Sequence, residues 1–190
     1  YFNVHAVSQH CINGGIVAHT ATPTGGTFTG NGIVNGNEFD PSVAGVGQHT
    51  LTYTYTDTNG CTNSVSEVAN VNNLIPVSFS GLNNLYCIDA AVVSLVGAPA
   101  GGTFSGPGVS GGQFDPSIAG AGTWDIIYTY LDSNGCANAD TQTTQVVNLP
   151  VVAITNLGTD YCYDAGVQTL NGTPAGGTFS GAGITGNMFD

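Results

Sequence analysis

The stretch TWDIIYTYLDSNGC, residues 123–136, shows most directly how this chain folds. Its first nine residues are rich in β-branched and aromatic side chains, which favour an extended strand. The Asp-Ser-Asn-Gly that follows has the residue types of a tight turn, and a cysteine ends the stretch. The stretch QHTLTYTYTDTNGC, residues 48–61, has the same plan 75 residues earlier. The sequence therefore predicts a strand, a turn and a cysteine that recur with this period.

Other segments repeat in the same phase. The string Gly-Gly-Thr-Phe begins at Gly25, Gly101 and Gly176, and Phe-Asp occurs at 39–40, 114–115 and 189–190. A long fixed period of this kind indicates an array of similar modules. We predict two full modules, residues 1–75 and 76–149, and the N-terminal part of a third, residues 150–190. We expect the sequence to be a window on a longer polypeptide.

The second module gives the clearest local pattern. We predict strands at residues 77–82, 90–96, 103–104, 113–114, 123–131 and 138–149. Frequent glycines and prolines between these segments argue against long helices. Six or seven short strands in about 75 residues are typical of an immunoglobulin-like sandwich. The predicted fold is therefore all-β, with tandem immunoglobulin-like antiparallel β-sandwich modules arranged end to end.

The charge of the chain excludes some partners. Lys and Arg are absent, and 12 acidic residues give a formal net charge of −12. Nucleic acid is a poor partner, because binding its phosphates depends on Lys and Arg. No apolar run reaches the ~20 residues that cross a bilayer, so direct membrane insertion is not expected. We expect neighbouring repeats of the same chain, or other copies of it, as the partners.

The five cysteines follow the repeat. Each full module has one cysteine near its start and one near its end, and the third has one near its start: Cys11, Cys61, Cys87, Cys136 and Cys162. We expect one disulfide inside each module, Cys11–Cys61 and Cys87–Cys136, with the partner of Cys162 beyond the chain end. Zinc is the weaker alternative, since a zinc site needs more ligands at close spacing. Structural disulfides indicate an oxidising compartment, either extracellular or periplasmic, and we expect an extracellular location at the cell surface.

Four aspartates are weak calcium candidates: Asp40, Asp57, Asp115 and Asp132. Asp57 and Asp132 begin Asp-x-Asn-Gly segments that resemble the start of a calcium loop but lack its later ligands. Asp40 and Asp115 stand between a phenylalanine and a proline. Ordinary turn chemistry, in which the carboxylate accepts backbone N–H groups, is the favoured interpretation for all four. We therefore expect no cofactor, with calcium as the alternative.

No group of residues indicates catalysis, and we expect no enzyme. All four histidines lie in the first module: His5, His10, His19 and His49. A metal cluster peculiar to that module is one interpretation, and divergence of single repeats is the favoured one. His10 aligns with Tyr86 and Tyr161, and His19 with Leu95 and Leu170. Trp124 is the one candidate for an exposed glycan-binding aromatic side chain.

The repeat frame resembles a known class. Residues 87–136 contain Cys, GGTFSGPGV, FDP, AGAG and YTYLDSNGC in order. This frame resembles the tandem immunoglobulin-like repeats of giant Bacteroidetes cell-surface adhesins, including gliding-motility adhesins exported by the type IX secretion system. The resemblance implies a secreted surface protein and supplies no catalytic residues.

Three functions follow as hypotheses. The first is a structural stalk or spacer that holds a distal adhesive region of a long adhesin or fibre away from the cell. The second is a self-assembling extracellular filament subunit, joined by strand donation into the incomplete third module. The third is a glycan-binding module.

Overall fold

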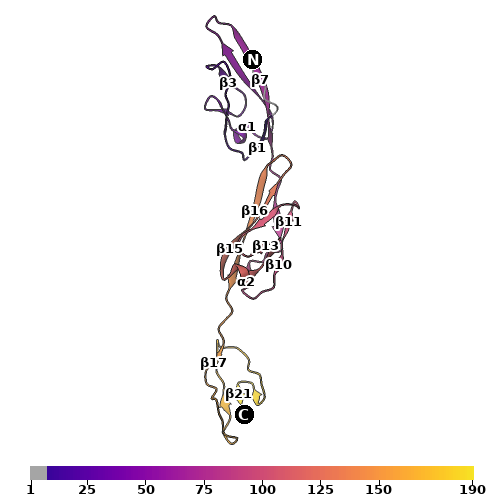
Figure 1. Ribbon diagram of the computed structural model, residues 1–190. Helices are drawn as coiled ribbons and strands as arrows, with labels where there is room; N and C mark the ends of the chain where they lie inside the picture. The colour runs from indigo at the N-terminus through magenta and orange to yellow at the C-terminus, as the bar shows by residue number, and fades with distance from the viewer. Residues whose placement is uncertain (1–7) are drawn as a thin grey trace.

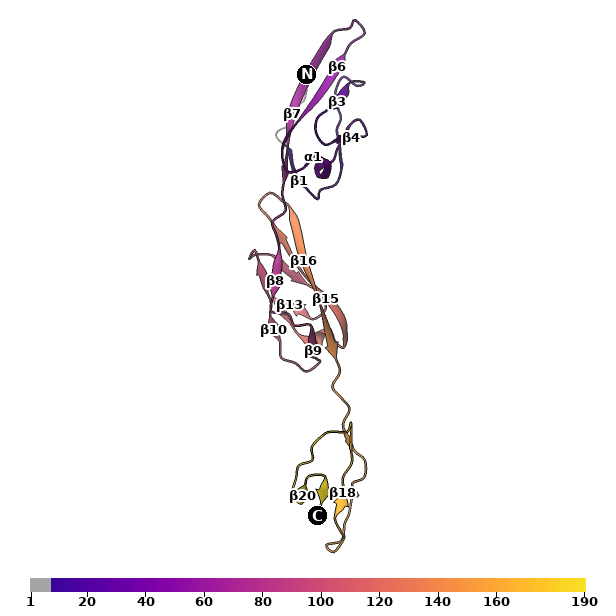
Figure 2. The same ribbon diagram turned by 180° about the vertical axis from the view of Figure 1, so that it is seen from behind.

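The computed structural model describes residues 8–190, and its regular structure is nearly all β. Among these residues, each strand pairing joins partners within residues 8–72, within 78–147 or within 153–189. Figures 1 and 2 show the three groups of strands following one another along one long axis. They are called the first, second and third modules below.

The first two modules share one topology. A four-stranded sheet has the order β1-β7-β6-β3 in the first module and β9-β16-β15-β12 in the second. A three-stranded sheet has the order β2-β5-β4 and β10-β14-β13, respectively, and the second module adds the pair β11-β8. The elements of the first module are β1 (Ser8–Cys11), β2 (Val17–Ala18), β3 (Thr27–Thr29), β4 (Ile33–Val34), β5 (Glu38–Phe39), α1 (Pro41–Ala44), β6 (Gly47–Thr56) and β7 (Thr62–Asn72). Those of the second are β8 (Ser78–Ser80), β9 (Leu85–Cys87), β10 (Val93–Ser94), β11 (Val96–Ala98), β12 (Thr103–Ser105), β13 (Val109–Ser110), β14 (Gln113–Phe114), α2 (Pro116–Ala119), β15 (Gly122–Leu131) and β16 (Ala137–Val147).

The long hairpin β15–β16 organises the second module. It is antiparallel and in register from Leu131 opposite Ala137 to Gly122 opposite Val146. Alternate side chains of a strand face the same side, so Ile126 and Tyr128 both enter the core. The core cluster forms where this face meets the smaller sheets, and its buried members are Phe79, Tyr86, Leu95, Phe114, Ile126, Tyr128 and Val146.

The edge strand beside each long hairpin runs parallel to its neighbour, so the expectation of a wholly antiparallel arrangement is wrong there. Cys11, at the end of β1, lies opposite Asn72, the last residue of β7. In the same way, Cys87 of β9 lies opposite Val147 of β16. Parallel neighbours need a crossover connection. The chain supplies it, because it passes through the smaller sheet before it returns along the hairpin.

Two local expectations also need correction. The predicted strand 90–96 is divided, because Val93–Ser94 pairs with β14 whereas Val96 begins β11, which pairs with β8. The Phe-Asp-Pro segments begin single helical turns, α1 and α2, that period-based reasoning missed. Asp40 and Asp115 are their N-cap residues, and the following proline fits the first helical position.

The third module contains only short strands: β17 (Ala153–Ile154), β18 (Gln168–Thr169), β19 (Gly172–Thr173), β20 (Ile184–Thr185) and β21 (Met188–Phe189). Its three-stranded sheet β18-β21-β20 matches β10-β14-β13, and the pair β17-β19 matches β8-β11. Five residues separate β7 from β8, residues 73–77, and five separate β16 from β17, residues 148–152. The two linkers therefore have equal length.

Candidate functional site at the module junction

The disulfide bond joins two different modules. Cys11 of the first module bonds to Cys136 of the second, with 5.5 Å between their Cα atoms. The expected bonds Cys11–Cys61 and Cys87–Cys136 are therefore wrong. Cys61, Cys87 and Cys162 are exposed free thiols.

The length of the hairpin explains why the cysteines of one module do not pair. Cys61 directly precedes Thr62, the first residue of β7, whereas Cys11 lies opposite Asn72, the last. At the usual strand rise, ten residue steps separate these positions by roughly 33 Å. A disulfide requires Cα atoms within about 7 Å. Each of the first two modules therefore carries one cysteine at each end.

Two hydrogen bonds flank the disulfide. The side-chain amide of Asn13 donates to the carbonyl oxygen of Ala137 at 3.3 Å. The side-chain amide of Asn138 donates to the carbonyl oxygen of Ile75, in the linker, at 2.8 Å. The tip of hairpin β15–β16 thus contacts both the end of β1 and the linker. Figure 1 shows this tip reaching up to the first module.

The turn at the hairpin tip holds Cys136 in place. The carboxylate of Asp132 accepts the backbone N–H groups of Asn134 and Cys136, each at 2.8 Å. Asp57 accepts the N–H groups of Asn59 and Cys61 at 2.9 Å in the same way. The hydrogen bond from the Cys61 amide is the main cause that lowers the pKa of Asp57. These two weak calcium candidates therefore act as turn residues.

Asp40 and Asp115, the other two calcium candidates, cap helical turns. Each accepts the backbone N–H and the hydroxyl of the serine two residues later, Ser42 or Ser117, at 2.9 Å and 2.6 Å. These serine hydroxyls are the main cause that lowers the pKa of both carboxyl groups. Within residues 8–190, no three His, Cys, Asp or Glu side chains gather as metal ligands would.

The described histidines take up structural positions. The ring of His10 lies 5.0 Å from that of Phe39, as Tyr86 lies 5.4 Å from Phe114. Burial is the main cause that lowers the pKa of His10, and the nearby His19 lowers it further, whereas Glu67 raises it. His19 Nδ1 lies 3.5 Å from a carboxylate oxygen of Glu67. His5 lies outside the described residues.

His49 and Trp124 stand at equivalent positions of the repeat, 75 residues apart, and make the same kind of contact in their modules. Trp124 Nε1 donates to the carbonyl oxygen of Gly120 at 2.9 Å. His49 Nε2 lies 2.7 Å from the carbonyl oxygen of Gly45, the matching residue after α1. Trp124 is half-buried and packs against the core. Its placement therefore disfavours a role as an exposed glycan-stacking ring.

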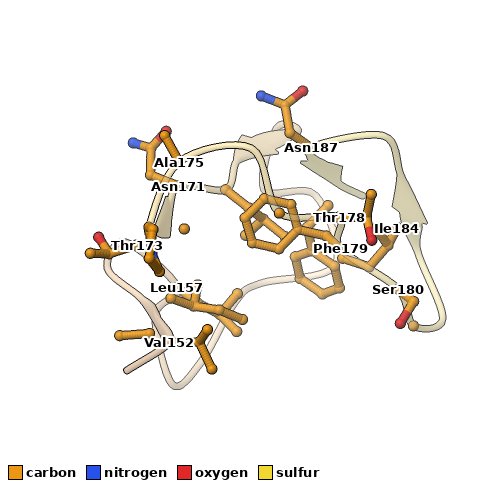
Figure 3. Close-up of a pocket in the computed structure, with 18 of the residues that line it drawn as sticks. Val152, Leu157, Asn171, Thr173, Ala175, Thr178, Phe179, Ser180, Ile184 and Asn187 are labelled. Carbon is orange, nitrogen blue, oxygen red and sulfur yellow. The ribbon is translucent and has the colours of Figure 1, made fainter. Parts of the chain in front are cut away.

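The third module contains a hollow of about 970 Å³. Figure 3 shows side chains such as Val152, Leu157 and Phe179 around it. In the second module, Phe104, the equivalent of Phe179, packs against Tyr128 of the long hairpin with ring centres 4.5 Å apart. The hollow therefore lies on the apolar surface that corresponds to the one the hairpin covers in the second module.

Comparison with known proteins does not assign the chain to a family. No family model matches the chain, and no curated protein matches it. One similar solved structure is described as a "Ca2+-stabilized adhesin" that "helps an Antarctic bacterium reach out and bind ice", at 16% identity and a TM-score of 0.36. The likeness covers 97% of this chain and 59% of that one, so this chain spans less than two thirds of its length. A TM-score this low does not establish a shared fold.

Neither helical turn is a membrane span. Each contains four residues, and no helix within residues 8–190 is long and apolar enough to cross a bilayer.

Proposed function

We propose that this chain is a row of spacer modules in the stalk of a long extracellular adhesin or fibre, holding a distal adhesive region away from the cell. The observation that carries the proposal is the disulfide between Cys11 and Cys136, which links successive modules. The five-residue linker crosses the same junction. Two covalent connections and two hydrogen bonds limit bending between the modules.

Other features support the same role. The modules follow one another along one axis in both views (Figures 1 and 2). A structural disulfide persists in an oxidising compartment, which supports a location outside the cell. The repeat frame supports immunoglobulin-like sandwich modules of the kind found in giant Bacteroidetes surface adhesins, with type IX secretion as the export route. The partners are neighbouring repeats, and the proposal involves no enzymatic activity and no cofactor.

Small-angle scattering of the oxidised chain tests this role. A module whose long strands have about ten residues measures roughly 35 Å along its axis, so three modules in line give a long, narrow particle. The double variant Cys11→Ser/Cys136→Ser should fold and show a wider spread of lengths, because only the linker then joins the modules covalently. A compact oxidised particle, with modules side by side, would contradict the stalk.

A filament subunit, joined by strand donation into the third module, is the second candidate. The lining of the hollow in that module is apolar at Val152, Leu157 and Phe179, and a donated hairpin with the pattern of β15–β16 would cover it. Light scattering tests this candidate on the 190-residue chain. Concentration-dependent polymers that a peptide copy of residues 120–149 dissolves would support strand donation. A monomer that leaves the peptide unbound would exclude it.

A further inference from the structure

The free cysteines occupy the same positions as the bonded ones. Cys61 stands at the tip of hairpin β6–β7, as Cys136 does at the tip of β15–β16. Cys87 lies opposite the last residue of β16, as Cys11 lies opposite the last residue of β7. Cys61 and Cys87 therefore stand at the two kinds of position that are bonded to each other in Cys136 and Cys11.

The backbone around Cys61 has the same hydrogen bond and turn geometry as the backbone around the bonded Cys136. At the hairpin tips, the Asp57 N–H donates to the Cys61 carbonyl at 2.9 Å, and the Asp132 N–H to the Cys136 carbonyl at 3.0 Å. The glycines before the two cysteines, Gly60 and Gly135, have φ angles of 84° and 81°. Forming the bond at Cys61 therefore requires no rearrangement of its turn.

The cysteines near the start of the three modules, here called the start cysteines, also share a hydrogen-bond pattern. The carbonyl oxygens of Cys11, Cys87 and Cys162 each accept the N–H of the residue three positions later, at 2.8, 3.0 and 2.9 Å. The next residues, Ile12 and Ile88, both donate to the last residue of the long strand at 2.9 Å. The linkers that follow the first and second modules also have equal length.

We propose that Cys61, Cys87 and Cys162 are cross-linking sites for equivalent repeats, so that the start cysteine of each module bonds to the hairpin-tip cysteine of the next. The resulting ladder of disulfides locks each junction in turn. In this ladder Cys87 bonds to the tip of the third module, Cys162 to the tip of the module after it, and Cys61 to the start cysteine of the module before the first. The ladder extends the stalk proposed above to its other junctions and rests on that proposal.

Each bond is a thiol–disulfide exchange. The two cysteine thiols lose two protons and two electrons and form one S–S bond, while an oxidising disulfide takes them up and becomes two thiols. Oxidised glutathione is the disulfide used in the test. Exposure of Cys61 and Cys87 leaves both thiols open to attack by, or exchange with, such a reagent.

Extending the chain tests the ladder. A copy of residues 116–149, added after Asp190, completes the third repeat in phase, because Asp190 is the equivalent of Asp115. Refolding with oxidised glutathione should give two cross-linked peptides, Cys11–Cys136 and Cys87 with the added copy of Cys136. With serine in place of that added cysteine, Cys87 should stay open to iodoacetamide while Cys11–Cys136 still forms.

A second extended chain keeps the test decisive if the first extended chain does not fold. Residues 41–74 of the first module, which carry Cys61, can be added after Asp190 in the same phase. The ladder is overturned if Cys87 bonds to the original Cys61, Cys136 or Cys162 and not to the added cysteine, or if Cys87 stays reduced in both extended chains. These outcomes concern connectivity, whereas the stalk is tested by particle length, so the two proposals can fail separately.

Discussion

Cys11 and Cys61 lie at opposite ends of strand β7, because Cys11 pairs with Asn72 while Cys61 directly precedes Thr62. The two cysteines of the first module therefore lie at its two ends. In the second module, Cys136 is bonded to the first module, while Cys87 lies at the other end of hairpin β15–β16, opposite Val147. Cysteines at opposite ends of a module can bond to different neighbouring modules, which suits a head-to-tail arrangement.

Peptide mapping without reduction should recover Cys11 joined to Cys136. Trypsin has no site, because the chain lacks Lys and Arg, so chymotrypsin is the suitable protease. Its aromatic and leucine sites separate the five cysteines into different peptides. A peptide that joins Cys11 to Cys61 would contradict the structure, and a reduced sample is the control.

Tyr128→Phe should destabilise the second module by about 1–3 kcal/mol. The buried Tyr128 hydroxyl accepts the Gly102 N–H at 2.8 Å and donates to the carbonyl of Pro99, and phenylalanine leaves both groups without a partner. Urea unfolding followed by Trp124 fluorescence measures the change, because the chain's one tryptophan lies in this module.

Tyr130→Phe is the matched control for this prediction. Tyr130 is half-buried on the same strand, and its hydroxyl makes no hydrogen bond within residues 8–190. Equal losses of stability in the two variants would show that the bridge to Pro99 and Gly102 contributes nothing specific.

Asp132→Ala should lower the unfolding midpoint reported by Trp124, at a cost of about 1–3 kcal/mol for the two amides it leaves unbonded. Those amides belong to Asn134 and the buried Cys136. Asp57→Ala removes the same interactions from the other hairpin tip and should leave the Trp124 transition unchanged. Identical shifts from both substitutions would refute a local role for Asp132.

Acid should destabilise the first module through His10. Its folded pKa is lowered, chiefly by burial, from the ordinary 6.5. The unfolded chain therefore binds more protons than the folded chain once the pH falls through 6.5. Stability falls as the pH falls in that range, until the folded pKa is passed. His10→Tyr, which installs the residue found at Tyr86 and Tyr161, should flatten this part of the melting-temperature profile. An unchanged pH slope in the variant would assign the effect to other groups.

Local structure was largely predictable from the repeat. The long strand 123–131 and the turn after it appear where the residue types place them, because β-branched runs and Asp-x-Asn-Gly segments act through nearby atoms. The turn role of Asp57 and Asp132 is confirmed for the same reason. The helical turns α1 and α2 were missed because a four-residue helix has no period to detect, although the Asp-Pro start was visible.

The equivalent roles of His49 and Trp124 show a second limit of prediction from residue types. Their side chains differ in size, so comparison of residue types separates them. In both, a ring nitrogen lies within hydrogen-bond distance of the carbonyl oxygen of the glycine after the helical turn, at 2.7 Å for His49 and 2.9 Å for Trp124. The shared role of the two side chains became visible only in their contacts in the structure.

The repeat period can be read directly from the residues, and the all-β character and the turns follow from local residue types. The pairing of the cysteines became visible in the three-dimensional structure. The parallel pairing of β1 with the end of β7 carries Cys11 to the far end of its module, within reach of Cys136. A disulfide depends on distance in space, and no spacing along the chain reveals that a strand has been placed beside the end of a hairpin formed some 60 residues later.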